Sequence, residues 1–84
     1  LMDDKDRMIA ATRDKERVES LLNIISNKDL ANDSLQNIIA SNADYNSLLK
    51  DGKFDSSDIW ENMNKLEDIR NKAIRDYDDA FEDY

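Results

Sequence analysis

The stretch Leu35–Leu49, LQNIIASNADYNSLL, decides the fold that we expect for this chain. At 3.6 residues per turn its apolar side chains fall on one face of a helix, so the other segments are expected to pack around it. The residues of this face are Leu35, Ile38, Ile39, Tyr45 and Leu49. Asn42 lies in the middle of the same face, where a buried amide needs a partner and can fix the register between helices.

The composition indicates a small helical domain. Its 84 residues suffice for one domain with a modest core, and the chain holds one glycine and no proline, whereas an all-β domain needs more turn residues. Cysteine and histidine are both absent, which excludes a disulfide framework and the usual zinc ligand sets and fits a reducing compartment. We therefore expect an all-α fold without a metal or other cofactor.

The charge of the chain narrows the class of partner. Twenty acidic residues stand against 12 basic ones, giving a net charge of −8. A nucleic acid or an anionic lipid surface needs a basic face, so a protein with a basic surface is the expected partner. No apolar run approaches membrane-spanning length, so we do not expect direct insertion into a membrane. Leu1-Met2-Asp3 does not begin a signal peptide, and this unusual start suggests a domain excised from a longer protein, with any address signal outside it. The expected location is the cytoplasm.

Two predicted helices precede the single glycine. Residues 3–26 carry one apolar stripe at helical spacing and form the first. The second covers about residues 33–51 and begins at Asn32 or Asp33, where Asp33 and Gln36 have the spacing of a capping box. Gly52 supplies the left-handed conformation that the end of a helix prefers.

The third predicted helix covers residues 56–82. Asp55 is its expected N-cap, and Phe54 and Ile59 occupy the two positions of a hydrophobic staple. Three amphipathic helices with short links favour a single domain over residues 1–84, folded as an antiparallel up-down-up three-helix bundle. The expected core includes Leu22, Leu35, Ile38, Leu49, Met63 and Leu66.

Catalytic and calcium sites are not expected. Adjacent acids such as Asp78 and Asp79 point in different directions on a helix, and no enclosed apolar cleft is indicated that would perturb a carboxyl pKa. The acidic loop 51–58 fails the EF-hand pattern, because its third position is Lys53 and its glycine comes second instead of sixth. The chain is therefore expected not to be an enzyme.

Four apolar residues lie off the helix stripes, namely Ile9, Ile24, Leu48 and Trp60. In an up-down-up bundle the start of the first helix, the end of the second and the start of the third share one end. Ile9, Leu48 and Trp60 are therefore expected to lie near one another. They form either a partner surface or part of the broad apolar face that each helix of a three-helix bundle needs, and both interpretations stay open.

The middle segment resembles the final helix of GAT domains. Its pattern is a leucine, an aliphatic pair, an asparagine–acidic cluster, a large apolar residue and a closing aliphatic pair. The matching residues are Leu35, Ile38, Ile39, Asn42, Asp44, Tyr45, Leu48 and Leu49. GAT domains are three-helix bundles of VHS-containing and GGA-type trafficking adaptors. The matching helix is the last in that family and the middle one here, and the Asn- and Asp-rich composition is compatible with a fungal member.

The resemblance implies a non-catalytic adaptor module that binds ubiquitin weakly in vesicle trafficking and endocytosis, in the cytoplasm near endosomes or actin patches. Its implied binding site combines apolar residues with nearby carboxylates. The candidate partner-binding residues are Ile9, Asp44, Tyr45, Leu48, Asp51 and Trp60. Two other classes stay open: a structural or assembly helix bundle that buries its exposed apolar residues against another subunit, and an acidic inhibitor that mimics DNA.

Overall fold

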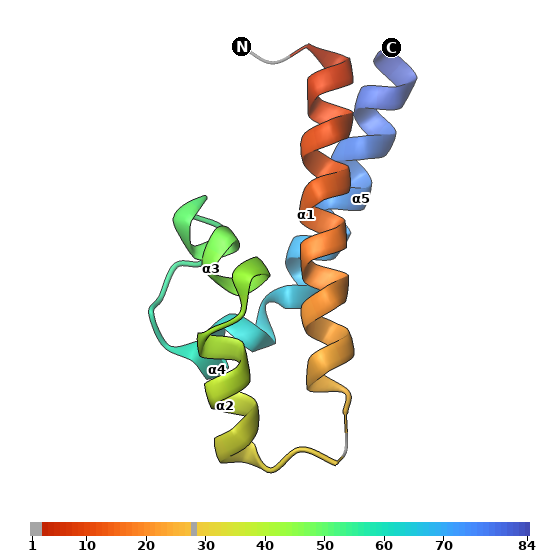
Figure 1. Cartoon of the computed structure of the whole chain (residues 1–84). Helices are drawn as coiled ribbons and strands as arrows, with labels where there is room; N and C mark the ends of the chain where they lie inside the picture. Colours follow the sequence, from red (N-terminus) through yellow and green to blue (C-terminus); the bar gives the residue numbers. More distant parts are fainter. Residues whose placement is uncertain (1–2, 28) are drawn as a thin grey trace.

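The computed structural model describes residues 3–27 and 29–84; residues 1, 2 and 28, which belong to the predicted domain and to its first link, lie outside the described residues. The described residues form helices and no strand, so the all-α prediction is confirmed. They form five helices, however, and the expected number of three is wrong. The helices are α1 (Asp4–Ile25), α2 (Asn32–Ala40), α3 (Ala43–Lys50), α4 (Ile59–Asn64) and α5 (Leu66–Asp83) (Figure 1).

The two long helices, α1 and α5, pack side by side and run antiparallel (Figure 1). We call this pair the stem. Because the start of α1 and the end of α5 lie together, the last helix does not run parallel to the first, as an up-down-up bundle requires. The predicted topology is therefore wrong. The shorter helices α2, α3 and α4 lie on the side of the second half of α1, away from the chain termini (Figure 1). The described part of the molecule is elongated, with extents of 44 × 22 × 18 Å.

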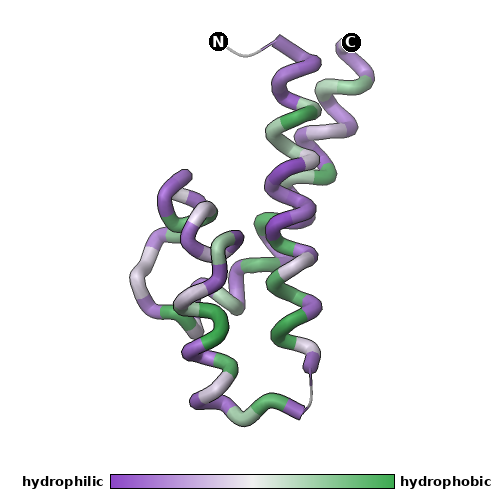
Figure 2. The backbone as a smooth tube through the Cα atoms, in the orientation of Figure 1, coloured by the Kyte–Doolittle hydropathy of each residue, from purple (hydrophilic) through white to green (hydrophobic). Residues whose placement is uncertain are grey.

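Helix α1 agrees with the predicted first helix to within one residue at each end. Its N-cap is Asp3, whose Oδ1 accepts a hydrogen bond from the backbone N–H of Asp6 over 2.8 Å. Val18 and Leu21, in its second half, are fully buried. Figure 2 shows hydrophobic segments in both halves of α1, and those of the second half lie where the short helices pack against it. The core therefore sits at one end of the stem.

The predicted second helix is interrupted at Asn42. This residue has an extended backbone (φ −73°, ψ 134°), and its side-chain oxygen accepts hydrogen bonds from the backbone N–H groups of Asp44 (2.8 Å) and Tyr45 (3.1 Å). Asn42 is thus the N-cap of α3, and the expectation that it fixes helix register from a buried seam is wrong. The capping box is wrong as well: α2 begins at Asn32 after Ala31, which makes no side-chain cap.

Gly52 ends α3 as predicted, with φ +73°. The N–H groups of Gly52 and Lys53 donate to the carbonyl oxygens of Leu49 (3.1 Å) and Leu48 (3.0 Å), which is the Schellman pattern. The chain then runs on without regular structure to Asp58. Within this loop Phe54 is buried and packs on Tyr45, with ring centroids 5.4 Å apart. This contact holds the loop against α3.

The predicted third helix begins later and is interrupted. Asp58, not Asp55, is the N-cap of α4, and its Oδ1 accepts from the N–H groups of Trp60 (2.9 Å) and Glu61 (3.3 Å). Asp55 instead accepts a hydrogen bond from Lys65 Nζ over 2.9 Å. A turn at Lys65 separates α4 from α5, and α5 stays helical through Asp83.

The core is formed where α1, the short helices α2 and α3 with the loop that follows them, and the start of α5 meet. Its buried apolar residues are Val18, Leu21, Leu35, Ile39, Tyr45, Leu48, Phe54 and Leu66. Leu35 and Leu66 confirm the core prediction, and the half-buried Leu22 and Met63 pack against the cluster. Ile38 and Leu49 are exposed, so their assignment to the core is wrong.

Candidate interaction surface

The two break residues at Ser41 and Asn42 change which side chains face the core. Beyond this break Tyr45 and Leu48 are buried while Leu49 is exposed, the reverse of the order that one continuous helix would give for the two leucines. The expectation that Tyr45 and Leu48 offer exposed apolar surface is therefore wrong. Both belong to the core that fixes α3 on α1.

The structure does not bring Ile9 and Trp60 together. Both are exposed, as a partner surface requires, but Ile9 lies on the stem and Trp60 lies at the start of α4. The expected cluster of Ile9, Leu48 and Trp60 is wrong because α5 returns alongside α1 in the antiparallel direction. Five of the exposed apolar residues instead line two separate grooves, and Ile38, Phe81 and Tyr84 line neither of them.

The first groove, which we call the Trp60 groove, lies between α2, α3 and the start of α4. It is a hollow of about 630 Å³. Its residues are Gln36, Ala40, Tyr45, Asn46, Leu49, Ser56, Ser57, Asp58, Ile59 and Trp60. Trp60 is 43% exposed and Leu49 is also exposed, so the groove offers apolar surface to solvent. Asp58 is its one charged residue.

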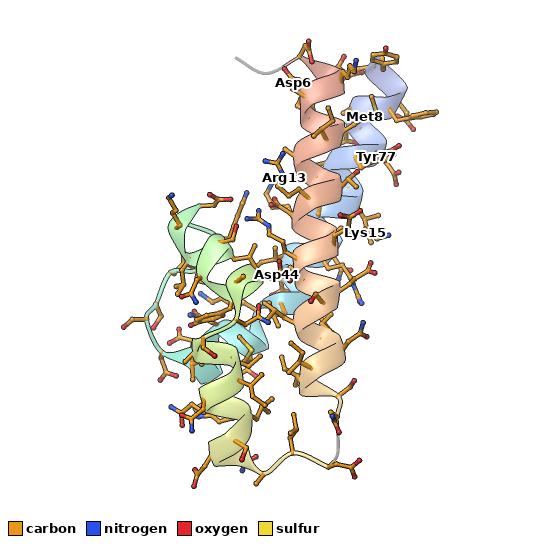
Figure 3. The ribbon with its side chains drawn as sticks, viewed as in Figure 1. Asp6, Met8, Arg13, Lys15, Asp44 and Tyr77 are labelled. Atoms are coloured by element: carbon orange, nitrogen blue, oxygen red, sulfur yellow. The ribbon has the colours of Figure 1, made fainter. Side chains whose placement is uncertain are left out.

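The second groove, which we call the stem groove, runs along one side of the seam between α1 and α5. It consists of two hollows of about 320 and 440 Å³ that share Thr12, Glu16 and Tyr77. Met8, Ile9 and Ile74 add its apolar lining. In Figure 3, Met8 and Tyr77 lie close together at this seam. The sequence pattern indicated Ile9 but not the residues of α5, because only the antiparallel packing of the two helices places them beside it.

The opposite side of α1 is polar, and Arg17 lies at its centre. The buried guanidinium donates from Nη1 to Ser47 Oγ (2.6 Å) and to Asp51 Oδ2 (2.7 Å), and from Nη2 to Asp14. Lys53 Nζ lies 3.1 Å from Asp14 Oδ2. We call Arg17 and these four residues the polar joint. It ties α1 to α3 and to the turn that follows α3.

The polar joint explains the position of Asp51. The hydrogen bond from Arg17 lowers the pKa of the Asp51 carboxyl below its usual value of 3.8, and the positive charge of Arg17 acts in the same direction. Asp51, one of the predicted partner-binding residues, therefore has a partner within the chain. Asp44, another of them, is half-buried in the first turn of α3. The sequence signal for the joint was weak, since only the i,i+3 spacing of Asp14 and Arg17 indicated an ion pair.

Three further findings bear on the class of protein. Among residues 3–27 and 29–84, no group of three or more acidic, cysteine or histidine side chains is placed to hold a metal ion. No helix in the same ranges combines the length and the apolar character needed to cross a membrane. Comparisons with protein-family models, with curated proteins and with solved structures found no match to the chain.

Proposed function

We propose that this chain is a non-catalytic protein-interaction module whose Trp60 groove binds an apolar patch on a basic-surfaced partner protein. Ubiquitin, which the GAT-like pattern of residues 35–49 implies, is the partner that we propose. The observation that carries the proposal is the exposure of Trp60 beside a hollow of about 630 Å³.

Trp60 has the chemistry of a binding anchor. The chain buries its other large side chains of this region, Tyr45 and Phe54, against each other, but leaves Trp60 and its neighbour Leu49 in contact with water. Tryptophan is enriched among the residues that dominate binding energy at protein interfaces. Burying the exposed part of Trp60, roughly 100 Å² of surface, contributes about 2–3 kcal/mol to association.

The charges around the groove favour a basic partner. Asp58 lines the groove, and Glu61 follows Trp60 in the first turn of α4. The net charge of −8 adds a long-range attraction for a positive surface. Because such rim charges act mainly on the association rate, we expect binding to weaken and slow as salt is added.

A groove of this size predicts weak binding. Association costs translational and rotational freedom, so one anchor and a few neighbours give a Kd of about 1 μM to 1 mM, or roughly −8 to −4 kcal/mol. Transient adaptor contacts have affinities in this range. The proposal implies a cytoplasmic location, near endosomes if the module acts in vesicle trafficking.

The test is a titration of ¹⁵N-labelled chain with ubiquitin, followed by amide chemical shifts. We expect shift changes at Leu49, Ile59 and Trp60, and at least about a tenfold loss of affinity in Trp60→Ala, because the anchor is removed. Phe81→Ala is the matched control, since it removes an exposed aromatic ring from the stem, far along α5. That variant is expected to bind as the wild-type chain does.

Two results would contradict the proposal at different levels. The absence of shift changes at about 1 mM ubiquitin rules out ubiquitin as the partner, since this lies at the weak end of the expected range. Unchanged binding by a Trp60→Ala variant that is folded by circular dichroism keeps the ligand but rejects the Trp60 groove as its site.

A further inference from the structure

The stem carries an apolar face that no other part of the described chain covers. Ile9, Ile74, Tyr77 and Phe81 are all exposed on it, and the rings of Tyr77 and Phe81 stack with their centroids 6.3 Å apart. The helices α2, α3 and α4 cover the core at the other end of α1 (Figure 1). A pair of helices covers only one face of each helix and leaves apolar side chains at the edge of the seam in solvent. This face therefore resembles a three-helix bundle from which one helix is missing.

The packing of the stem explains why the face stays open. The buried residues between α1 and α5 in this region are alanines, namely Ala11, Ala73 and Ala80. These small side chains let the two helices approach closely, and the larger apolar residues are left at the edge of the seam. There they line the stem groove together with Thr12 and Glu16.

The dimensions of the groove suit one helix. Ile74 and Tyr77, which line the groove, and Phe81, which stacks on Tyr77 beyond it, follow the i, i+3, i+7 spacing of a single helical face. At 1.5 Å per residue they span about 10 Å, which two turns of a partner helix cover. A helix that lies in such a groove contributes its own apolar stripe and keeps its polar face in solvent.

The charges of the groove favour a basic helix. Lys15 is paired with Glu19 over 3.3 Å, whereas Glu16 and Asp78 have no ion-pair partner within the part of the chain that the structure describes. Arg13 is the remaining base at the groove, and it also reaches the polar side of α1 (Figure 3). Residues 76–84 contain five acids and no Lys or Arg. Asp76 pairs with Lys72 (2.6 Å) and Asp83 lies 3.8 Å from Arg7, which leaves Asp78, Asp79 and Glu82 without an ion-pair partner in the described part of the chain. A second copy of this chain would bring a like charge of −8 and the same acidic segment, so it fits the groove less well.

We propose that the stem groove is a docking site for one amphipathic helix of a basic partner protein, separate from the Trp60 groove. The apolar stripe of that helix packs on Ile9, Ile74 and Tyr77. Its Lys or Arg side chains flank the stripe and pair with Glu16 and Asp78.

The probe is a synthetic 18-residue helical peptide with leucines along one face and lysines on the rest. Two peptides serve as controls: one has the same composition in an order without a stripe, and the other has glutamate in place of lysine. Each is titrated into the ¹⁵N-labelled full chain. We expect the striped basic peptide alone to bind, with shift changes centred on Thr12, Glu16 and Tyr77.

Two pairs of variants test the site. Tyr77→Ala is expected to weaken peptide binding by about tenfold, while Trp60→Ala, which removes an aromatic ring of similar exposure (39% for Tyr77 and 43% for Trp60), leaves it unchanged. Asp78→Asn is expected to weaken binding by about two- to threefold and to reduce its salt dependence. Asp68→Asn removes the same charge from an exposed position of α5 outside the groove and leaves both unchanged. Ile9→Ala, on the other helix, repeats the apolar test without changing the charge of the groove should Tyr77→Ala fail to fold.

Several outcomes would overturn the proposal. Equal binding of the unstriped peptide, or shifts spread over all acidic surfaces, indicates attraction between net charges without a groove. Binding of the glutamate peptide rejects the basic partner. Sedimentation that shows a dimer of the chain alone, with stem shifts that depend on concentration, assigns the groove to a second copy.

Discussion

Asn62 donates a hydrogen bond from Nδ2 to Tyr45 Oη over 2.8 Å, and both side chains are buried. The bond joins α4 to α3 through the core, beneath the Trp60 groove that Tyr45 also lines. The other polar atom of the amide, Oδ1, has no hydrogen-bond partner in the described part of the chain. This single bond is therefore what offsets the cost of burying the Asn62 amide.

Tyr45→Phe is expected to lower the free energy of unfolding by about 1–3 kcal/mol, because it leaves the buried Asn62 amide without a partner. Urea denaturation followed by circular dichroism measures the change. Tyr77→Phe removes a hydroxyl from an exposed ring on the stem and should stay within about 0.5 kcal/mol of wild type. A combined Tyr45→Phe and Asn62→Leu variant should lose less than the two single changes added together. Strict additivity would show that the bond contributes nothing.

Asp58→Ala is expected to destabilise the chain by about 0.5–2 kcal/mol, the usual effect of removing an N-cap. Asp55→Ala should cost less, because Asp55 is exposed and its pair with Lys65 is a surface ion pair. Asp58→Asn should retain most of the stability, since an asparagine oxygen can accept the same two hydrogen bonds. Thermal unfolding of the three variants gives the order. If Asp55→Ala proved the most harmful, the start of α4 would be wrong.

The sequence predicted the helical class and α1 because these depend on patterns that extend over many residues. The apolar stripe of residues 3–26 continues for six turns, so no local alternative competes with it. Residues 33–51 carry an equally good stripe, but Asn42 suits both the interior of a seam and an N-cap. Asn42 acts as an N-cap in the structure, and the break there lets Tyr45 and Leu48 pack in the core with residues of α1. This is a contact between distant segments, which the periodicity of the sequence does not indicate.

The direction of α5 was beyond the reach of the sequence for a similar reason. Asp55 and Asp58, three residues apart, are both suitable N-caps. The sequence pattern therefore allows the helix after Gly52 to begin after either residue. The packing of Phe54 on Tyr45 holds the loop along α3, and the turn at Lys65 then directs α5 back beside α1. The candidate site differs from the predicted one for the same reason. Trp60 is exposed as predicted, but Leu48 lies in the core, and the antiparallel packing of α5 on α1 forms a stem groove that was not predicted.

Leu48→Asp, a charge placed in the core, is expected to unfold the chain. Leu48 is fully buried, and an unpaired carboxylate there costs several kcal/mol, which exceeds what a small domain can lose. Leu49→Asp makes the same change one residue later at an exposed position and should remain folded. Circular dichroism at 25 °C distinguishes the two. A folded Leu48→Asp variant would contradict the assignment of Leu48 to the core.

Gly52→Ala is expected to destabilise the chain by about 1 kcal/mol. Gly52 has φ +73°, and a Cβ there would meet no atom within 4 Å, so the change tests the backbone conformation alone. The left-handed conformation costs an alanine about 1–2 kcal/mol, and the less flexible unfolded chain returns a part of that. Gly52→Asn should cost less, because asparagine tolerates this conformation better. Denaturant midpoints measure both, and equal stability of Gly52→Ala and wild type would contradict a left-handed residue at this position.

The polar joint makes stability depend on pH in the acid range. The hydrogen bond from Arg17 lowers the pKa of Asp51 in the folded chain below its usual 3.8. A carboxyl whose pKa is lowered by folding adds stability at pH values above its unfolded pKa, and this contribution disappears as the pH falls through the folded pKa. The free energy of unfolding should therefore hold between about pH 7 and 5 and fall below about pH 4.

The Asp51→Asn variant isolates this contribution from the protonation of the other 19 acids. Its amide oxygen can still accept the hydrogen bond from Arg17, but it carries no charge and does not titrate. We expect Asp51→Asn to be less stable than wild type at pH 7 and to lose less stability on acidification, so that the two curves converge as the pH falls through the folded pKa of Asp51. Asp55→Asn is the matched comparison. The pKa of Asp55 is also lowered, by its hydrogen bond with Lys65, but this pair lies outside the polar joint, so the variant shows the effect of losing one such surface carboxylate elsewhere. Parallel curves for wild type and Asp51→Asn would mean that the bond between Arg17 and Asp51 does not contribute to folding.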